Sequence, residues 1–331
     1  MRKSADVVIR MLPSLNDMKK VEPILVAIHC LVYNHEPYLR DCFEGFVMQK
    51  TNFRFVAIVH DDVSKDGSAA IIREYAEKYP DIFMPIYEIE NQWSKKDGSL
   101  ERIMDETIDA IGAKYVAMCE GDDYWTDPYK LQKQVDYLEA HPDFSMCCHG
   151  ADVINETSRP VDNACERLQT REYFPEDAFP AWQIPTASIV YRRKEVLQYP
   201  IVRIQDFRAL DVVLILRCMH VGRVWGMAEH MSVYRMNEGG LTSVPESNEI
   251  QMKLCKHYKA LLLNFPQLDA DYCHRYIAMI YYTNFRNTKG LKAKIQSLWI
   301  AILNKPSYVF RKIFKIKAKP RKDLFYQYYG Q

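Results

Sequence analysis

The sequence lacks the motifs that mark three common kinds of binding site. Its nine cysteines are scattered, and because no two of them form a C-x-x-C pair, we do not expect a cysteine-ligated zinc site. Neither G-x-G-x-x-G nor G-x-x-x-x-G-K-(S/T) occurs, so a dinucleotide-binding motif and a P-loop have no support. Several cysteines lie inside apolar runs, which is typical of reduced, buried thiols in a cytosolic protein.

Long apolar segments and an excess of one charge are also missing. No apolar run is long enough to span a bilayer, and no apolar leader stands at the N-terminus, so we expect neither a transmembrane helix nor a signal peptide. The formal net charge is +1 over 331 residues, so we expect no nucleic-acid partner. These absences predict a cytoplasmic protein, either in solution or attached at the inner face of the cell membrane.

Residues 24–140 alternate four times between a strand pattern and a helix pattern. Such alternation predicts an α/β domain with a doubly wound, mostly parallel sheet and right-handed crossovers. A buried helix is expected at 210–222, and a helical pattern runs from about residue 246. The strands are expected at 24–33, 53–60, 82–89, 114–118, 144–154, 186–193, 223–227 and 231–236.

Polar segments follow three of the predicted parallel strands. They are "YNHE" (33–36), "HDDVSKDGS" (60–68) and "CEGDD" (119–123). Ligands of such sheets bind at the carboxyl ends of the strands. The sequence therefore predicts that these three segments meet at one edge of the sheet.

Four acidic side chains lie within the eight positions 120–127, which begin in the third segment and end just after it. Asp127 precedes Pro128, a pair typical of a helix start, so we expect Asp127 to cap the next helix. Asp122 and Asp123 have no such local role. Adjacent carboxylates repel one another, and a shared divalent cation would remove that cost, although a solvated turn is the alternative.

The segment "HDDVSKDGS" also has two interpretations. Asp61 and Asp62, at the end of a strand, could accept hydrogen bonds from a nucleotide base or from ribose hydroxyls. Alternatively, Ser64 or Asp66 simply caps the following helix.

Six separated segments form a recognisable pattern by their order and spacing. They are 30–50, 55–82, 86–94, 114–153, 185–193 and 231–243. Together they resemble the family 2 glycosyltransferases, over about residues 22–245, and look like the bacterial enzymes of that family that build surface polysaccharides. The resemblance implies the GT-A fold and inverting transfer of a sugar from a nucleotide-sugar donor, with uridine the expected base, to a glycan or lipid-linked acceptor.

The resemblance also implies roles for individual residues. "EGDD" takes the place of the D-x-D motif of the family, with Asp122 as the main ligand of Mn²⁺ or Mg²⁺ and Asp123 as its support. Glu120 stands where the family has Asp, which keeps the charge, and Asn237 stands where it often has His. The implied nucleotide-binding residues are Val32, Tyr33, Asn34, Glu36, Asp61, Asp62, Glu120, Asp122 and Arg235.

The resemblance places the catalytic base at the start of a helix, about eleven residues before a Gly. Counting back from Gly222 gives Asp211, with Asp206 as the nearby rival and a simple helix cap as the alternative role. The acceptor side is expected to include Trp182, Thr186 and Ser188. Trp125 could lie there too, or in the core.

The remaining expectations concern the organisation of the chain. We expect a lead-in at 1–22, a glycosyltransferase domain at 23–245 and a helical extension at 246–331. Residues 310–322 alternate apolar and basic side chains, which suits an anionic membrane surface, a solvated helix or an RNA-binding arm.

Two other classes of function compete with the enzyme hypothesis. One is a nucleotide-binding scaffold without turnover, favoured by Leu210, where relatives have Gly, and by Asn237. The other is a nucleotidyltransferase, which usually needs a Gly-rich basic loop after the first strand that "YNHEPYL" does not provide.

Overall fold

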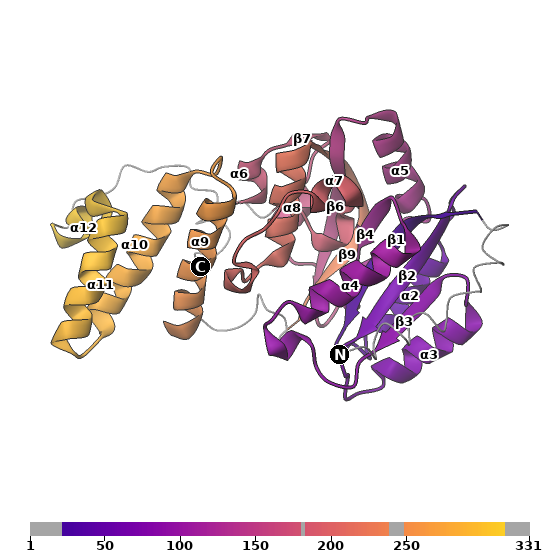
Figure 1. Ribbon diagram of the computed structural model, residues 1–331, viewed down its shortest axis with the longest axis horizontal. Helices are drawn as coiled ribbons and strands as arrows, with labels where there is room; N and C mark the ends of the chain where they lie inside the picture. The colour runs from indigo at the N-terminus through magenta and orange to yellow at the C-terminus, as the bar shows by residue number, and fades with distance from the viewer. Residues whose placement is uncertain (1–21, 180–182, 238–247, 315–331) are drawn as a thin grey trace. The chain divides into compact units, whose positions relative to one another are not determined.

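The computed structural model describes residues 22–179, 183–237 and 248–314, and these divide into two compact units (Figure 1). The first unit contains the described residues of 22–173, 183–199 and 221–237. The second contains those of 174–179, 200–220 and 248–314. The expected division of the chain at residue 245 stays a prediction.

Four parallel strands form one part of the sheet in the first unit. They lie in the order β3-β2-β1-β4, and each is followed by a helix, which confirms the predicted alternation. Apolar runs such as "VAI" in β1 are buried on both faces, as expected of a strand between two layers of helices. The elements are β1 (Ile24–Val32), α2 (Leu39–Val47), β2 (Arg54–Asp61), α3 (Ser68–Lys78), β3 (Phe83–Tyr87), η2 (Trp93–Lys95), α4 (Ser99–Ile111), β4 (Tyr115–Met118) and α5 (Lys130–Ala140).

The sheet continues past β4 with strands of mixed direction. β8 pairs antiparallel with both β4 and β6, whereas β6 and β9 run parallel along most of their length. Most residue pairings in the whole sheet are therefore parallel. The further elements are β5 (Tyr124–Trp125), β6 (Phe144–Asn155), η3 (Ala164–Arg167), β7 (Arg171–Tyr173), η4 (Thr186–Ser188), β8 (Val190–Arg192), α7 (Arg193–Leu197) and β9 (Arg223–Met236).

Two predicted strands differ in the structure. Residues 186–188 form a 3₁₀ turn, closed by the Ser188 N–H donating to the Pro185 carbonyl (3.0 Å), so the strand begins only at Val190. The two short strands expected at 223–227 and 231–236 are one strand, because β6 pairs with the whole of it through register shifts at His149, Gly150 and Ala151.

An aromatic cluster lies in the core under α2. The Phe43 and Phe83 ring centres are 4.9 Å apart, as are those of Phe46 and Trp125, both edge-to-face. Trp125 is 1% exposed and its indole N–H donates to the Ala187 carbonyl (2.9 Å). The structure therefore gives Trp125 a core position.

The second unit is helical. The predicted buried helix is α8, and the Asp269 carboxylate caps α10 by accepting from the Asp271 N–H (2.9 Å). Among the described residues, none of the helices has both the length and the apolar character needed to cross a bilayer. Of the basic segment 310–322, residues 315–322 lie outside the described residues. The elements are α6 (Pro175–Ala178), η5 (Ile204–Asp206), α8 (Leu210–Val221), α9 (Asn248–Asn264), α10 (Ala270–Asn287), α11 (Leu291–Asn304) and α12 (Pro306–Ile313).

Candidate functional site

The ends of β1, β2 and β4 meet at one edge of the sheet. Val32 pairs in register with Asp61, and the Val32 carbonyl accepts from the Asp62 N–H (3.0 Å). The Leu31 carbonyl accepts from the Gly121 N–H (3.0 Å). The three polar segments therefore lie together, as predicted, and form the rim described below.

Two side chains of the turn after β1 bind the loop after β2. Asn34 Oδ1 accepts from the Lys65 N–H (2.7 Å), and Glu36 Oε2 accepts from the Gly67 N–H (2.7 Å). Asn34 has a φ of +57°, a left-handed conformation that Asn tolerates better than most residues. Both side chains hold one loop against the other, while Tyr33 is 43% exposed at the rim.

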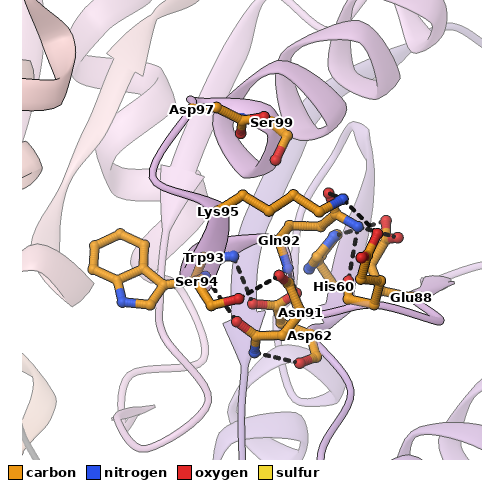
Figure 2. Close-up of polar contacts among 11 residues, drawn as sticks. His60, Asp62, Glu88, Asn91, Gln92, Trp93, Ser94, Lys95, Asp97 and Ser99 are labelled. Carbon is orange, nitrogen blue, oxygen red and sulfur yellow. Dashed lines mark hydrogen bonds and ion pairs between the residues drawn. The ribbon is translucent and has the colours of Figure 1, made fainter.

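Asp62 orders the segment after β3 (Figure 2). Its carboxylate is buried, and its two oxygens accept from the Gln92 N–H (2.6 Å) and the Trp93 N–H (3.0 Å). Both carboxylate oxygens are thus used within the protein. The neighbouring Asp61 is also buried, and its Oδ1 accepts from the Ser64 N–H (3.2 Å).

Figure 2 shows a polar network beside Asp62 that was not predicted from the sequence. Gln92 Nε2 donates to Glu88 Oε2 (2.9 Å), and Glu88 Oε1 lies 3.3 Å from His60 Nε2. The Trp93 indole points away from these polar groups, and the Lys96 ammonium lies 3.8 Å from its ring centre. The density of polar residues in "EIENQWSKKD" is the signal that could have indicated such a network.

The acidic loop after β4 is joined to the end of β9. Asp123 is 3% exposed and its Oδ1 accepts from the Arg235 N–H (2.9 Å). Burial, followed by the nearby Asp122 carboxylate, raises the pKa of Asp123 well above its ordinary value. Asp122 Oδ2 accepts from Asn237 Nδ2 (2.9 Å) and lies 4.0 Å from His35 Nε2. The structure therefore places Arg235 and Asn237 at the acidic loop.

The Arg235 guanidinium is held by groups of the protein itself. Nη1 donates to the Asp122 carbonyl (3.1 Å), Nη2 pairs with the Asp41 carboxylate, and the group lies 4.7 Å from the Tyr124 ring centre. Arg235 thus fixes the backbone of the acidic loop. Asp41 was missed, because an exposed acid on a helix carries no sequence signal for a partner 194 residues away.

Gly121 lets the acidic loop approach β1 closely. A Cβ atom at this position would lie 2.8 Å from His35 Nδ1, 3.0 Å from Leu39 Cδ2 and 3.0 Å from Val32 Cγ2. No side chain fits in this space without moving its neighbours. Gly121 therefore sets where Glu120 and Asp122 stand.

The donor groups fit a divalent cation that a bound phosphate helps to hold. The described residues contain no group of three or more His, Cys, Asp or Glu side chains able to enclose a metal by themselves. Mg²⁺ is commonly held by one or two carboxylates together with substrate phosphates and water. Asp122 is partly exposed and suits this arrangement, whereas the buried Asp123 suits a supporting role.

The other predicted residues do not belong to the three segments of this rim. Asp211 is in the first turn of α8, in the second unit, and its rival Asp206 forms an ion pair with Arg203 (2.5 Å). Ser188 is fully buried and its hydroxyl donates to the Pro185 carbonyl (2.6 Å), which favours a structural role over an acceptor contact. Thr186 is partly exposed, and Trp182 lies outside the described residues.

Comparison with known proteins gives matches in sequence and in fold. Residues 28–197 match the family model described as Glycosyl transferase family 2. An uncharacterized protein of Mycobacterium tuberculosis is 36% identical over 217 residues, which are 65% of this chain and 60% of that protein. An uncharacterized glycosyltransferase of Nostoc sp. is 26% identical over 219 residues, 62% of each chain. The chain thus spans only about 60% of the length of these relatives.

A solved structure shares the fold. S. aureus TarS 1–349 in complex with UDP-GlcNAc superposes with a TM-score of 0.59 at 15% sequence identity, over 86% of this chain and 83% of that one. The family model covers more than half of the chain, and the ends of β1, β2 and β4 all lie inside the matched residues. The chain therefore belongs to the family 2 glycosyltransferases, and it has their GT-A fold.

Proposed function

We propose that the chain transfers a sugar, with inversion, from a UDP-linked donor to a hydroxyl of a glycan or lipid-linked acceptor in surface polysaccharide synthesis. The observation that carries this proposal is the rim itself, where Asp61 at the end of β2 and Asp122 after β4 stand on either side of β1 in a family 2 glycosyltransferase. The fold shared with TarS, which has been solved with UDP and with UDP-GlcNAc, supports a uridine nucleotide at this rim.

Tyr33 and Asp61 are the proposed base-binding residues. The exposed Tyr33 ring can stack on a planar base, and the Asp61 carboxylate can accept from a base N–H or a ribose hydroxyl. Asn34, Glu36 and Asp62 are proposed to act indirectly. Their side chains bind backbone N–H groups and so hold the loops around the base.

The diphosphate is proposed to lie at Asp122. A divalent cation bound there would offset the negative charge that develops on the leaving nucleoside diphosphate. Arg235 and Asn237 hold the acidic loop so that the Asp122 carboxylate faces the rim. Asp123, buried behind it, anchors the end of β9.

Asp211 is proposed to act as the base. It would take the proton of the acceptor hydroxyl as that oxygen attacks C1 of the donor sugar and the bond from C1 to the phosphate oxygen breaks. Its place in the first turn of α8 favours the ionised carboxylate, because the N-terminal end of a helix stabilises negative charge.

A thermal-shift screen of nucleoside diphosphates and nucleotide sugars, with and without Mn²⁺, tests donor binding. A ligand raises the melting temperature in proportion to RT ln(1 + [L]/Kd), so the correct nucleotide should give the largest shift, and only with the metal. Asp122→Ala should abolish that shift, whereas Asp81→Ala, in an exposed turn before β3, should keep it. No shift with any nucleotide would contradict the proposal.

A nucleotide-binding scaffold without turnover is the second candidate. One observation favours it. Asn237 Nδ2 donates a hydrogen bond to Asp122 Oδ2, an oxygen that would otherwise be available to a metal. Mn²⁺-dependent UDP binding without release of UDP from any nucleotide sugar would identify the scaffold.

A further inference from the structure

Helix α11 carries an apolar stripe that no described residue covers. Leu291, Ile295, Trp299 and Leu303 are spaced four apart and are 75%, 59%, 60% and 64% exposed. Because 3.6 residues make one turn, this spacing places all four on one side of the helix. We call these four residues the α11 stripe.

The opposite side of α11 already packs within the second unit. Ala301, which faces away from the stripe, is fully buried, and Figure 1 shows α10 running alongside α11. The helix is therefore apolar on two sides, and only one of them packs against other described residues. A helix that is apolar all round normally has a partner on each side.

Helix α12 adds to this exposed apolar surface. Val309 is 2% exposed and holds the helix in place, while Phe310, Ile313 and Phe314 are 55%, 50% and 62% exposed. The Phe310 and Phe314 ring centres lie 4.4 Å apart. Exposed aromatic rings of this kind are typical of surfaces that lie at the interface of a bilayer.

The charged residues in the sequence segment that contains α11 and α12 are all of one sign. Residues 288–322 contain eleven Lys or Arg and no acid, so the rest of the chain carries a net charge of −10. Lys289, Lys292 and Lys294 stand at one end of the stripe, and Arg311 and Lys312 follow its other end. An apolar stripe flanked by lysines matches an anionic lipid surface, because lysines bind the headgroups while the apolar side chains enter below them.

An open cavity in the same unit suits an anionic group. It has a volume of about 340 Å³ and presents two cationic side chains, Arg286 from α10 and Lys312 from α12. Its lining has no acidic residue and is completed by Tyr282, Thr283, Asn287 and Tyr308. Guanidinium, ammonium and hydroxyl donors around one cavity are the groups that bind a phosphate.

We propose that α11 and α12 dock the protein on an anionic membrane, with the α11 stripe in the headgroup region and the cavity around a lipid phosphate. This surface belongs to the second unit, whereas the rim proposed to bind the nucleotide belongs to the first. Vesicle binding and nucleotide binding are independent measurements, so either can fail without the other.

Flotation of the full chain with vesicles tests the proposal. We expect binding to vesicles of 30% phosphatidylglycerol in phosphatidylcholine, little binding to phosphatidylcholine alone, and loss of binding at high salt. The variant Leu291→Gln, Trp299→Gln, Leu303→Gln should bind at least tenfold more weakly. Leu263→Gln, an equally exposed leucine on α9, is the matched control and should bind like the unchanged protein.

A second variant tests the cavity and the charge. Arg286→Gln with Lys312→Gln should lower binding to anionic vesicles by roughly 25-fold, since each of the two cations near the surface contributes about fivefold. Because all these positions are exposed, the melting temperatures should change little. Absence of binding by the unchanged protein, or equal binding by the stripe variant, overturns the proposal. Dimerisation that the stripe variant abolishes, without vesicle binding, would assign the stripe to a second copy instead.

Discussion

The position of the acidic loop depends on single residues. At one of them, Gly121, the neighbouring side chains leave no space for a Cβ atom. Gly121→Ala would place a methyl group 2.8 Å from His35 Nδ1 and 3.0 Å from Val32 Cγ2. We expect the loop to move, with a loss of about 1–3 kcal/mol in the free energy of unfolding and at least tenfold weaker Mn²⁺-dependent UDP binding. Calorimetric titration with UDP and urea unfolding measure the two effects.

Gly290→Ala is the matched control for this substitution. Its backbone lies in an ordinary region at a φ of −83°, and no atom lies within 4 Å of the added methyl group. This variant should bind UDP like the unchanged protein. Equal UDP affinity for the Gly121 and Gly290 variants would show that the close approach of the loop does not matter for binding.

Asp62 is a second residue whose role is structural. Asp62→Ala leaves the Gln92 and Trp93 N–H groups without their acceptors, and we expect a loss of about 2–3 kcal/mol in the free energy of unfolding. Asp97→Ala, which removes the acceptor of the Ser99 N–H near the start of α4, should cost about 1 kcal/mol or less. If the Asp62 variant were as stable as the Asp97 variant, the network in Figure 2 would not stabilise the fold.

Helix α5, in the first unit, contains a buried lysine. Lys130 is fully buried in its first turn, with its ammonium 4.1 Å from the Trp125 ring centre and no hydrogen-bond partner for Nζ among the described residues. Burial lowers the pKa of Lys130 from 10.5 to about 7. Nothing in the sequence distinguishes this lysine from the others, because its burial depends on the tertiary packing of α5.

The buried lysine predicts how stability depends on pH. Between pH 7 and 10.5 the unfolded chain holds a proton on Lys130 that the folded chain has lost, so this residue makes stability rise with pH by up to roughly 1.4 kcal/mol per unit. Below pH 7 Lys130 is charged in both the folded and the unfolded chain, so the full free-energy cost of burying that charge remains. We therefore expect Lys130→Met to stabilise the protein most at pH 6–7 and less as the pH rises.

Urea unfolding at pH 6, 7, 8 and 9 measures this difference between variant and unchanged protein. Lys133→Met, one turn further along α5, removes a partly exposed lysine that pairs with Asp127 (2.8 Å). That control should lose less than about 1 kcal/mol, with no such trend between pH 7 and 9. A Lys130→Met gain that did not shrink with pH would contradict the low pKa.

The strands and helices also show which parts of the fold could be predicted from the sequence. Continuous apolar runs and helical spacing predicted β1 to β4 and the helices between them, because each element has its own pattern. β5 and β7 were missed because two or three residues are too short for a pattern. β9 was predicted as two strands because the polar residues Glu229 and His230 interrupt its apolar pattern, although β6 pairs with the whole strand.

Across the whole molecule, prediction worked where topology alone brings residues together. The ends of parallel strands must share an edge, so Val32, Asp61 and Asp122 could be placed on one rim from the sequence. The Arg235 partners could not, because Asp41 and Asp122 are far from it in the sequence and only folding joins them. Packing also decides which acids are exposed enough to bind a ligand and which, like Asp62, bind backbone N–H groups.

For the whole molecule, we propose that the rim binds the nucleotide sugar and that Asp211, in the first turn of α8, takes the proton of the acceptor. Release of nucleoside diphosphate from a nucleotide sugar, measured for the unchanged protein, Asp211→Asn and Asp206→Asn, tests it most directly. Asp206 is the matched control, since it lies five residues away and pairs with Arg203.

We predict that Asp211→Asn lowers turnover by roughly 10²- to 10⁴-fold while the affinity for the donor is kept, because only proton transfer is lost. Asp206→Asn should retain most of the turnover. Unchanged turnover in Asp211→Asn, or loss of turnover in Asp206→Asn alone, would contradict the account.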